Sequence, residues 1–170
     1  WTFTVGGRDT AYAKIQVPGA RYLNVASVHF DAGNEAADVA NRVAEARDLT
    51  NEIASASLSI DDYLVIAGDL NLSNRADEVC LGILTSNCVS DAHKPTTKLG
   101  SQNTNPAETS PYDLVLPSSL LEAQFVSYTY EGTTFADGMV YDTRYYDNHQ
   151  LPALRWDSRA TNLTHRPVMK

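Results

Sequence analysis

The nine residues VIAGDLNLS, positions 65–73, decide the fold because an apolar run ends abruptly in polar groups. The apolar part predicts a buried strand, and Gly68 permits a tight backbone exit from it. Asp69 and Asn71 then fall where strand becomes loop, a place where the sheet fixes side chains and loops give access to ligands. An Asp in this position also forms turns or caps a following helix, so the stretch alone leaves both interpretations open.

The segments around this stretch predict further strands and one long helix. Residues 11–30 contain two strand-like runs separated by Pro18-Gly19, which indicates a hairpin. Residues 34–57 carry apolar side chains at spacings of three and four, which predicts an amphipathic helix with this inward stripe: Val39, Val43, Ala46, Leu49 and Ile53. The remaining assignments are a strand buried on both faces at 61–70, a short helix at 76–84, a loop at 86–110 and strands at 112–118, 122–132 and 165–170.

Composition is that of an ordinary globular protein. The chain has 170 residues, of which 43% are hydrophobic and 20% charged, which predicts a single domain over residues 1–170. A formal net charge of −8 argues against binding nucleic acid or anionic membrane through bulk charge. No apolar run is long enough for a transmembrane segment, so a soluble chain is expected. Its compartment is open, with a secreted or extracytoplasmic location preferred.

The two cysteines, Cys80 and Cys88, are separated by seven residues, and no His or Cys stands at zinc-finger spacing from them. A zinc site is therefore not expected. Two buried thiols and one local disulfide remain equal alternatives, because a single pair of cysteines defines no framework.

Four strand ends carry polar residues directly beside an apolar run. His29 follows one run, Asp69 and Asn71 follow the next, and Asp113 and His165 precede two later ones. Each has an ordinary structural interpretation, since most histidines at strand ends are satisfied surface or core groups and most Tyr-Asp pairs form turns. Only their order and local sequence indicate a shared site.

The four words VASVHF, VIAGDLNLS, SPYDLVL and THRPVM occur in this order and cover nearly the whole chain. Together they resemble the endonuclease/exonuclease/phosphatase superfamily, and the Gly-Asp-Leu-Asn word is the most specific. The resemblance implies an α/β fold of two sheets, an α/β/β/α sandwich with helices outside both sheets. It also implies a metal-dependent phosphoesterase that hydrolyses a phosphodiester with activated water, most nearly of nuclease type.

The resemblance implies a role for each polar residue. Asp69 would orient or deprotonate the attacking water, and Asn71 would hold the phosphate through its amide. Asp113 would fix the tautomer of His165, which would contact the phosphate and stabilise developing charge. His29 would take part in acid–base chemistry. The cofactor would be a divalent cation, Mg²⁺ in preference to Mn²⁺ or Ca²⁺, with its protein ligands not assigned.

Two departures from the family pattern qualify these expectations. The family's terminal word has Asp before His, and here Thr164 stands in that place, which cannot give a carboxylate to a hard cation. Asp157 is a weak substitute that no motif supports. The early Asn and metal-binding Glu of the family have no counterpart before His29, so residues 1–16 are expected to be strands entering the second half of the fold. The chain would then be its C-terminal portion, partnered by the other half or by a second copy.

The substrate class stays open among nucleic acid, lipid phosphodiester and inositol phosphate. Arg166 follows His165 directly and is assigned, with Asn71, to substrate binding. Arg144, Arg155 and Arg159 either line the cleft with it as phosphate-binding forks or are ordinary surface arginines. Two alternatives to the enzyme remain: a catalytically impaired member of the fold that acts as a binding or interaction module, and an unrelated α/β domain.

Overall fold

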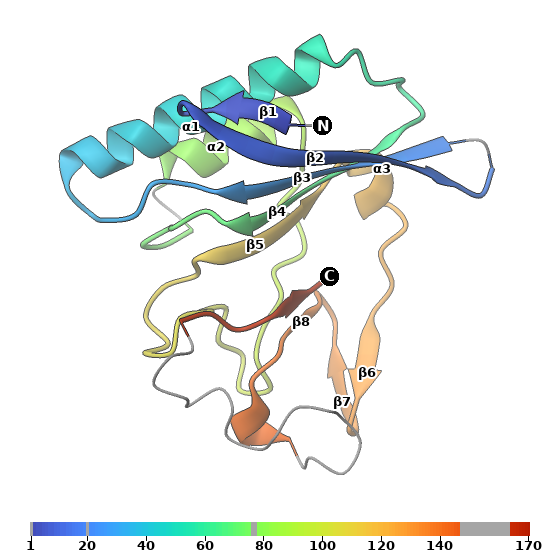
Figure 1. Ribbon diagram of the computed structural model, residues 1–170. Helices are drawn as coiled ribbons and strands as arrows, with labels where there is room; N and C mark the ends of the chain where they lie inside the picture. The colour runs from blue at the N-terminus through green and yellow to red at the C-terminus, as the bar shows by residue number, and fades with distance from the viewer. Residues whose placement is uncertain (1, 20, 76–77, 147–163) are drawn as a thin grey trace.

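A five-stranded sheet carries two helices on one face and smaller elements on the other (Figure 1). The computed structural model describes residues 2–19, 21–75, 78–146 and 164–170. No helix among them is long and apolar enough to cross a membrane. The predicted α/β class is confirmed, with the described residues supplying one helix layer, one large sheet and two small two-stranded sheets.

The large sheet has the strand order β1-β2-β3-β4-β5. Its strands are β1 (Thr2–Val5), β2 (Arg8–Val17), β3 (Arg21–His29), β4 (Tyr63–Asp69) and β5 (Asp113–Pro117). The expected hairpin joins β2 to β3, and all neighbours are antiparallel except β3 and β4. This parallel pair needs a crossover, which the long helix provides, so the ends of β3 and β4 finish at the same edge of the sheet.

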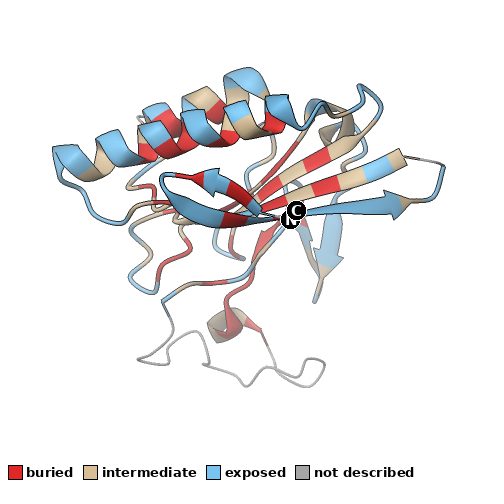
Figure 2. Ribbon diagram, turned by 45° about the horizontal axis from the view of Figure 1, so that its top comes forward, coloured by how far each residue is buried: buried red, intermediate tan, exposed pale blue. Residues whose placement is uncertain are grey.

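The crossover helix is α1 (Ala36–Ser55), and its short partner is α2 (Val79–Asn87). The side chains of Glu35 and Asp38 form a capping box at the start of α1, which satisfies N–H groups that have no partner inside the helix. Ala46, Leu49 and Ile53 are buried as expected, whereas Val39 and Val43 are only partly covered. Figure 2 shows the buried positions of α1 on its sheet-facing side.

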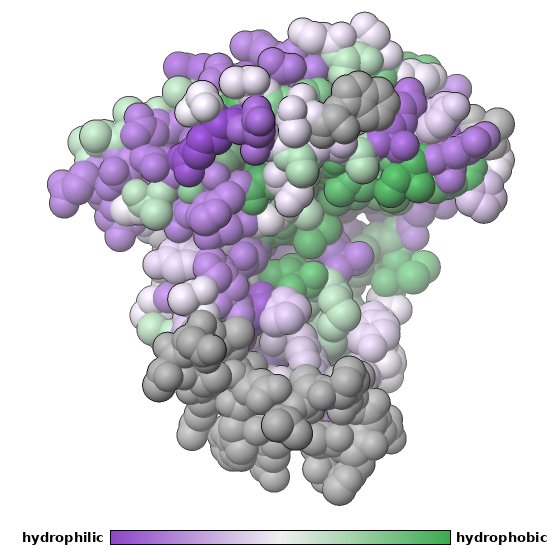
Figure 3. All heavy atoms as spheres, viewed as in Figure 1, coloured by the Kyte–Doolittle hydropathy of each residue, from purple (hydrophilic) through white to green (hydrophobic). Residues whose placement is uncertain are grey.

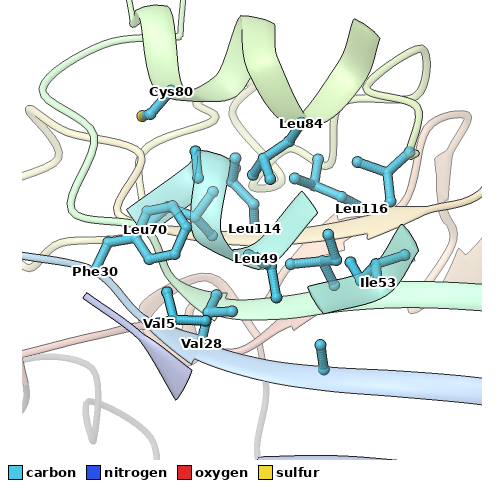
Figure 4. Packing of buried hydrophobic residues seen from close by; sticks show 14 of the residues in the cluster. Val5, Val28, Phe30, Leu49, Ile53, Leu70, Cys80, Leu84, Leu114 and Leu116 are labelled. Carbon is cyan, nitrogen blue, oxygen red and sulfur yellow. The ribbon is translucent and has the colours of Figure 1, made fainter. Parts of the chain in front are cut away.

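The core lies between the sheet and these two helices (Figure 4). Leu49 from α1 and Leu84 from α2 are fully buried there, and Leu114 from β5 is 1% exposed. Cys80 of α2 is buried in the same core, and Cys88 packs against it. Both cysteines are free, so of the two alternatives left by the sequence the structure contains thiols. Burial raises the pKa of each thiol to about 11, which keeps both protonated at neutral pH.

The opposite face of the sheet meets smaller elements. These are α3 (Ser119–Glu122), β6 (Tyr128–Tyr130), β7 (Thr133–Phe135), β8 (Met139–Val140), the 3₁₀ turn η1 (Thr143–Tyr145) and β9 (Val168–Met169). The strand expected over 122–132 is mostly wrong. Backbone N–H groups of Glu122 and Ala123 bond to the carbonyls of Ser118 and Ser119, so local helical turns replace the first half of that strand.

The expectation that β4 is buried on both faces is also wrong. Leu64 and Ile66 face the helices and are buried, but Val65 and Ala67 on the other face are only partly covered. A cavity of about 420 Å³ borders that face, and its apolar lining includes Val65, Val115, Leu121, Phe125, Val126, Met139 and Met169. Figure 3 shows hydrophobic residues gathered where the sheet meets the lower part of the molecule. The sheet therefore has one closed face and one that is open in part.

Candidate functional site

Sheet register brings the predicted site residues together. His29 ends β3, Asp69 ends the neighbouring parallel strand β4, and the two are register partners. Asp113 begins β5, which runs antiparallel to β4, and it is the register partner of Asp69. Three polar side chains from distant parts of the sequence therefore share one edge of the sheet, with His165 beside them just before β9.

Asp69 lies at the centre of the group. Its Oδ2 is 3.6 Å from Nε2 of His29 and 3.6 Å from Nε2 of His165. The Asp69 side chain is 13% exposed, whereas those of His29 and His165 are 71% and 37% exposed. Asp69 thus forms the floor of the site, and the two histidines form its solvent-facing walls.

His165 is oriented by Asp113. The Nδ1 of His165 lies 2.9 Å from Oδ2 of Asp113, so the predicted hydrogen bond is present. With Asp113 ionised, Nδ1–H donates and Nε2 faces Asp69 and the open side of the site. The ring of Tyr112 lies 6.0 Å from the His165 ring and borders the pair, a neighbour that the Tyr-Asp word gave no reason to select.

Asn71 adopts a backbone conformation that few residues tolerate. Its φ is +51°, in the left-handed region where Asn is among the favoured non-glycine residues. The turn is fixed by two hydrogen bonds: Asn71 N–H donates to Asp69 Oδ1, and Asn71 Nδ2 donates to the Phe30 carbonyl, each at 2.8 Å. An amide NH₂ has two hydrogens, so its second donor is free of this bond and available to a ligand.

The pKa of Asp69 is raised above its ordinary value. Burial is the largest cause, and the nearby carboxylate of Asp113 adds to it, against the lowering effects of the Asn71 N–H and of both histidines. A carboxylate with a raised pKa is a stronger base than an ordinary one. This suits a group that must accept a proton from water.

Three described side chains lie close enough to hold a metal ion. One ligand atom each from Asp69, Asp113 and His165 lies within 4.8 Å of the others. Mg²⁺ and Ca²⁺ prefer carboxylate oxygens, which two of the three supply, and a cation between adjacent carboxylates removes their mutual repulsion. The donor set therefore fits a divalent cation that completes its coordination with water and substrate oxygens.

Arg166 is not positioned to bind substrate, which corrects the sequence-based assignment. Its side chain is fully buried, its Nη2 donates to the Pro106 carbonyl at 3.0 Å, and its Nε pairs with Asp142 Oδ2 at 2.9 Å. Arg144 joins the same acidic side chain and Glu108. These guanidinium groups are therefore bound inside the protein. Arg155, Arg159 and Asp157 lie outside the described residues, and Thr164 is exposed.

A second group, which was not predicted from the sequence, connects the loops that follow β3 and β4. Arg42 of α1 is fully buried, donates to the carbonyls of Asp31 and Gly33, and pairs with Glu78 at 3.3 Å. Glu78 in turn accepts the backbone N–H of Ser73 at 3.1 Å. A charged residue on the inward face of α1 interrupts the apolar stripe, and this interruption was the available signal.

Solved structures share this fold. Sphingomyelinase C from Streptomyces griseocarneus matches with a TM-score of 0.53 and 15% identity, over 77% of this chain and 54% of that one. An endonuclease/exonuclease/phosphatase from Beutenbergia cavernae matches with a TM-score of 0.52 and 16% identity, over 72% and 34%. A double mutant of Staphylococcus aureus beta toxin with bound magnesium ions matches with a TM-score of 0.51 and 17% identity, over 64% and 41%.

The chain therefore has the fold of the endonuclease/exonuclease/phosphatase superfamily. It spans about half the length of the first of these structures and less of the other two. No family model matches the sequence, and no curated protein matches it. The likeness is one of fold, and the chemistry has to be argued from the site itself.

Proposed function

We propose that the protein is a divalent-metal-dependent hydrolase that cleaves a phosphodiester with water. The observation that carries the proposal is the position of Asp69, whose Oδ2 lies 3.6 Å from Nε2 of both His29 and His165. These separations exceed a hydrogen bond, so a water or a phosphate oxygen can bind to the three polar atoms from the exposed side of the histidines. The names of two similar structures, a sphingomyelinase and an endonuclease/exonuclease/phosphatase, agree with this class.

Each residue of the group has a role in this reaction. Asp69 orients the attacking water and accepts its proton, which its raised pKa favours. As an imidazolium held by Asp113 through Nδ1–H, His165 donates from Nε2 to a phosphate oxygen and stabilises the charge that develops there. Asn71 donates its second amide hydrogen to another phosphate oxygen. His29 is the most exposed of the group and gives a proton to the leaving oxygen.

Asp69 and Asp113 are the residues that would hold the cation, with Mg²⁺ favoured over Mn²⁺ and Ca²⁺. The magnesium ions bound to the beta toxin of the same fold support that choice. When bound, the cation supplies positive charge against the negative charge of the transition state. Thr164 offers a hydroxyl and no carboxylate. Among the described residues, the proposed ligand set therefore contains two carboxylates, those of Asp69 and Asp113.

The proposal is tested by hydrolysis of bis(p-nitrophenyl) phosphate with Mg²⁺, Mn²⁺ or Ca²⁺ and with excess EDTA. For the full-length protein, we expect metal-dependent turnover that falls by at least about a hundredfold in His165→Ala. His93→Ala is the matched control, because His93 also pairs through Nδ1 with an aspartate, Asp137 at 2.6 Å, and is similarly exposed. Equal loss in both variants, or turnover that survives His165→Ala, would contradict the proposed roles.

The class of substrate is identified by comparing hydrolysis of several phosphodiesters and phosphate esters. Single-stranded DNA, RNA, sphingomyelin vesicles and an inositol phosphate are offered to the same preparation, with nucleic acid as our first choice. The net charge of −8 gives no bulk attraction to nucleic acid or inositol phosphate, which are anions, or to zwitterionic sphingomyelin, so selectivity has to come from groups around the site.

A binding module is the second candidate, because Thr164 replaces a family carboxylate. Its signature is saturable binding of a phosphodiester that Asn71→Ala weakens, without turnover under any of the metals above. Isothermal titration with a non-hydrolysable phosphorothioate separates the two candidates, since binding with no hydrolysis of the oxygen substrate supports the module.

We also propose that residues 1–170 form one domain that works with a further structural half, either the missing half of the sandwich or a second copy. Two facts support this: the chain spans about half of the sphingomyelinase structure, and the face of the sheet beside Val65 and Val115 borders an apolar cavity. The isolated chain should then be a poor catalyst, and adding the other half should raise turnover. Full activity of the isolated chain would contradict this.

A further inference from the structure

The loop of residues 103–110 connects the two halves of the His165–Asp113 pair. Thr104 is the contact: its Oγ1 accepts the backbone N–H of Asp113 at 3.0 Å, and its carbonyl accepts the backbone N–H of Arg166 at 2.8 Å. Its side chain is 1% exposed. One buried threonine therefore bonds to the backbone of the aspartate and to the residue next to the histidine.

Arg166 fixes the rest of this loop. The Nη1 of its guanidinium donates to the carbonyl of Asn105 and its Nη2 to that of Pro106, which directly follow Thr104. The guanidinium is itself held by Asp142, which is fully buried, and lies 3.6 Å from Glu108. A planar guanidinium with several fixed donors can hold two carbonyls in one geometry, which an ammonium group cannot do.

We propose that Thr104 and Arg166 are positioning residues, which set the His165 imidazole against Asp113 and Asp69 without touching substrate. The contacts run without a gap from Asp142 through Arg166 to the loop, and from the loop through Thr104 to Asp113. His165 precedes Arg166 directly, so its backbone is placed by the same bonds. Buried ion pairs of this kind add specificity of arrangement more readily than stability.

The proposal rests on the proposed function only for its kinetic readout, so the first test is spectroscopic. In protein labelled with ¹⁵N-histidine, the Nδ1–H of His165 should give a low-field proton resonance, assigned by its loss in Asp113→Asn. We expect Thr104→Val and Arg166→Met to shift or remove this resonance. Thr104→Ser should keep it, because serine retains the hydroxyl acceptor, and the resonance of His93, paired with Asp137, serves as an internal reference.

The second test is kinetic, with the intact protein and the same phosphodiester. Thr104→Val should lower kcat by about ten- to a hundredfold and leave KM unchanged, as expected for a misplaced group that does not bind substrate. Thr104→Ser should recover most of the loss. Arg75→Met is the control for removing an ion-paired and largely buried arginine, because Arg75 pairs with Asp91 at 2.8 Å and not with this loop.

The results distinguish failure of the positioning role from failure of the proposed function. An unchanged His165 resonance and kcat in folded Thr104→Val and Arg166→Met overturn the proposal, as does an equal loss in Arg75→Met. If Arg166→Met fails to fold, Thr104→Val, which conserves volume, carries the test alone. A parent protein with the low-field resonance but no turnover contradicts the proposed function, and the spectra of the variants still decide the positioning role.

Discussion

Two aspartates of opposite function meet at the edge of the sheet. Asp113 is bonded to His165 and keeps a fixed partner, whereas Asp69 faces two histidines at 3.6 Å. The Asp113 oxygen that is bonded to the ring orients the histidine, whereas Oδ2 of Asp69 lies beyond hydrogen-bond distance from both histidines and is available to water. Substituting the two residues should therefore give different results.

Asp113→Asn should lower kcat by at least about a hundredfold, because a neutral amide no longer stabilises the His165 imidazolium that donates from both Nδ1 and Nε2. The free energy of unfolding should change by less than about 1.5 kcal/mol, since one partly exposed hydrogen bond is altered and not removed. Kinetics on the phosphodiester and urea denaturation measure the two quantities. Equal activity of parent and variant would exclude the orienting role.

Asp69→Asn should raise stability at neutral pH in metal-free buffer while it abolishes turnover. The pKa of Asp69 is raised by burial and by Asp113, so the protonated carboxyl favours the folded state. That contribution is fully present below the ordinary value of 3.8 and is lost as pH rises through the raised value. The gain from Asn should therefore be largest at neutral pH and vanish in acid.

Urea denaturation midpoints of the parent and of Asp69→Asn, measured with EDTA from acid to neutral pH, show whether the substitution raises or lowers stability. A variant that is less stable than the parent at neutral pH would show that the ionised carboxylate is favourable in the fold. It would also remove the physical reason for Asp69 acting as a base.

At the scale of single residues, the sequence predicted which polar side chains lie close together but not the residues that hold them in place. His29, Asp69 and Asp113 stand at strand ends, and Asn71 and His165 lie two or three residues from one, positions that can be recognised from alternation and turn residues. Thr104 sits in a loop dense in Ser, Thr and Asn, where no pattern distinguishes one hydroxyl from another. Arg166 was assigned by its proximity to His165, and proximity in sequence does not give the direction of a side chain.

Among the elements, the parallel pair β3–β4 sets the positions of His29 and Asp69, and Gly68 allows these two strands to lie close together. Gly68 has φ of +139°, and a Cβ built on it would lie 2.1 Å from the Val28 carbonyl oxygen on β3. The strands can therefore approach at this point only without a side chain. Asp69 follows directly, so its place depends on this contact.

Gly68→Ala should destabilise the protein by at least about 2 kcal/mol, through the collision and the strained φ. Gly82→Ala is the matched control, because Gly82 lies on α2 with no atom near the added Cβ. That change should instead stabilise by about 0.5–1 kcal/mol. Denaturant midpoints of the parent and the two variants measure these changes in stability. An unchanged midpoint for Gly68→Ala would show that β3 can move aside.

Element boundaries followed from sequence where periodicity was strong. The long helix was expected over 34–57 and spans 36–55, because its apolar spacing and its capping residues agree. The strand expected over 122–132 failed because Pro117 ends β5 and the following serines begin helical turns, a local effect that outweighs alternation further on. Strand alternation over few residues is a weak signal beside such turns.

For the whole molecule, we expect the partly open face of the sheet to govern association in solution. Val126, 78% exposed, lines the apolar cavity, and Tyr128 beside it is also exposed. Val126→Asp should reduce both binding of an apolar fluorescent dye and self-association in sedimentation, without loss of stability. Ile60→Asp is the control, because Ile60 is more exposed still, at 93%, and lies outside the residues that line the cavity. Equal effects of both variants would remove this face as the site of contact.

The thiols of Cys80, in α2, and of Cys88, which directly follows this helix, can report its local opening. Alkylating reagents attack the thiolate, and a pKa of about 11 leaves almost none of it while the helix is packed. Labelling of Cys80 and Cys88 therefore requires α2 to separate from the sheet, and the labelling rate reports the free energy of this local opening. Mass spectrometry of pulse-labelled protein would show whether ligand at the far edge of the sheet slows it.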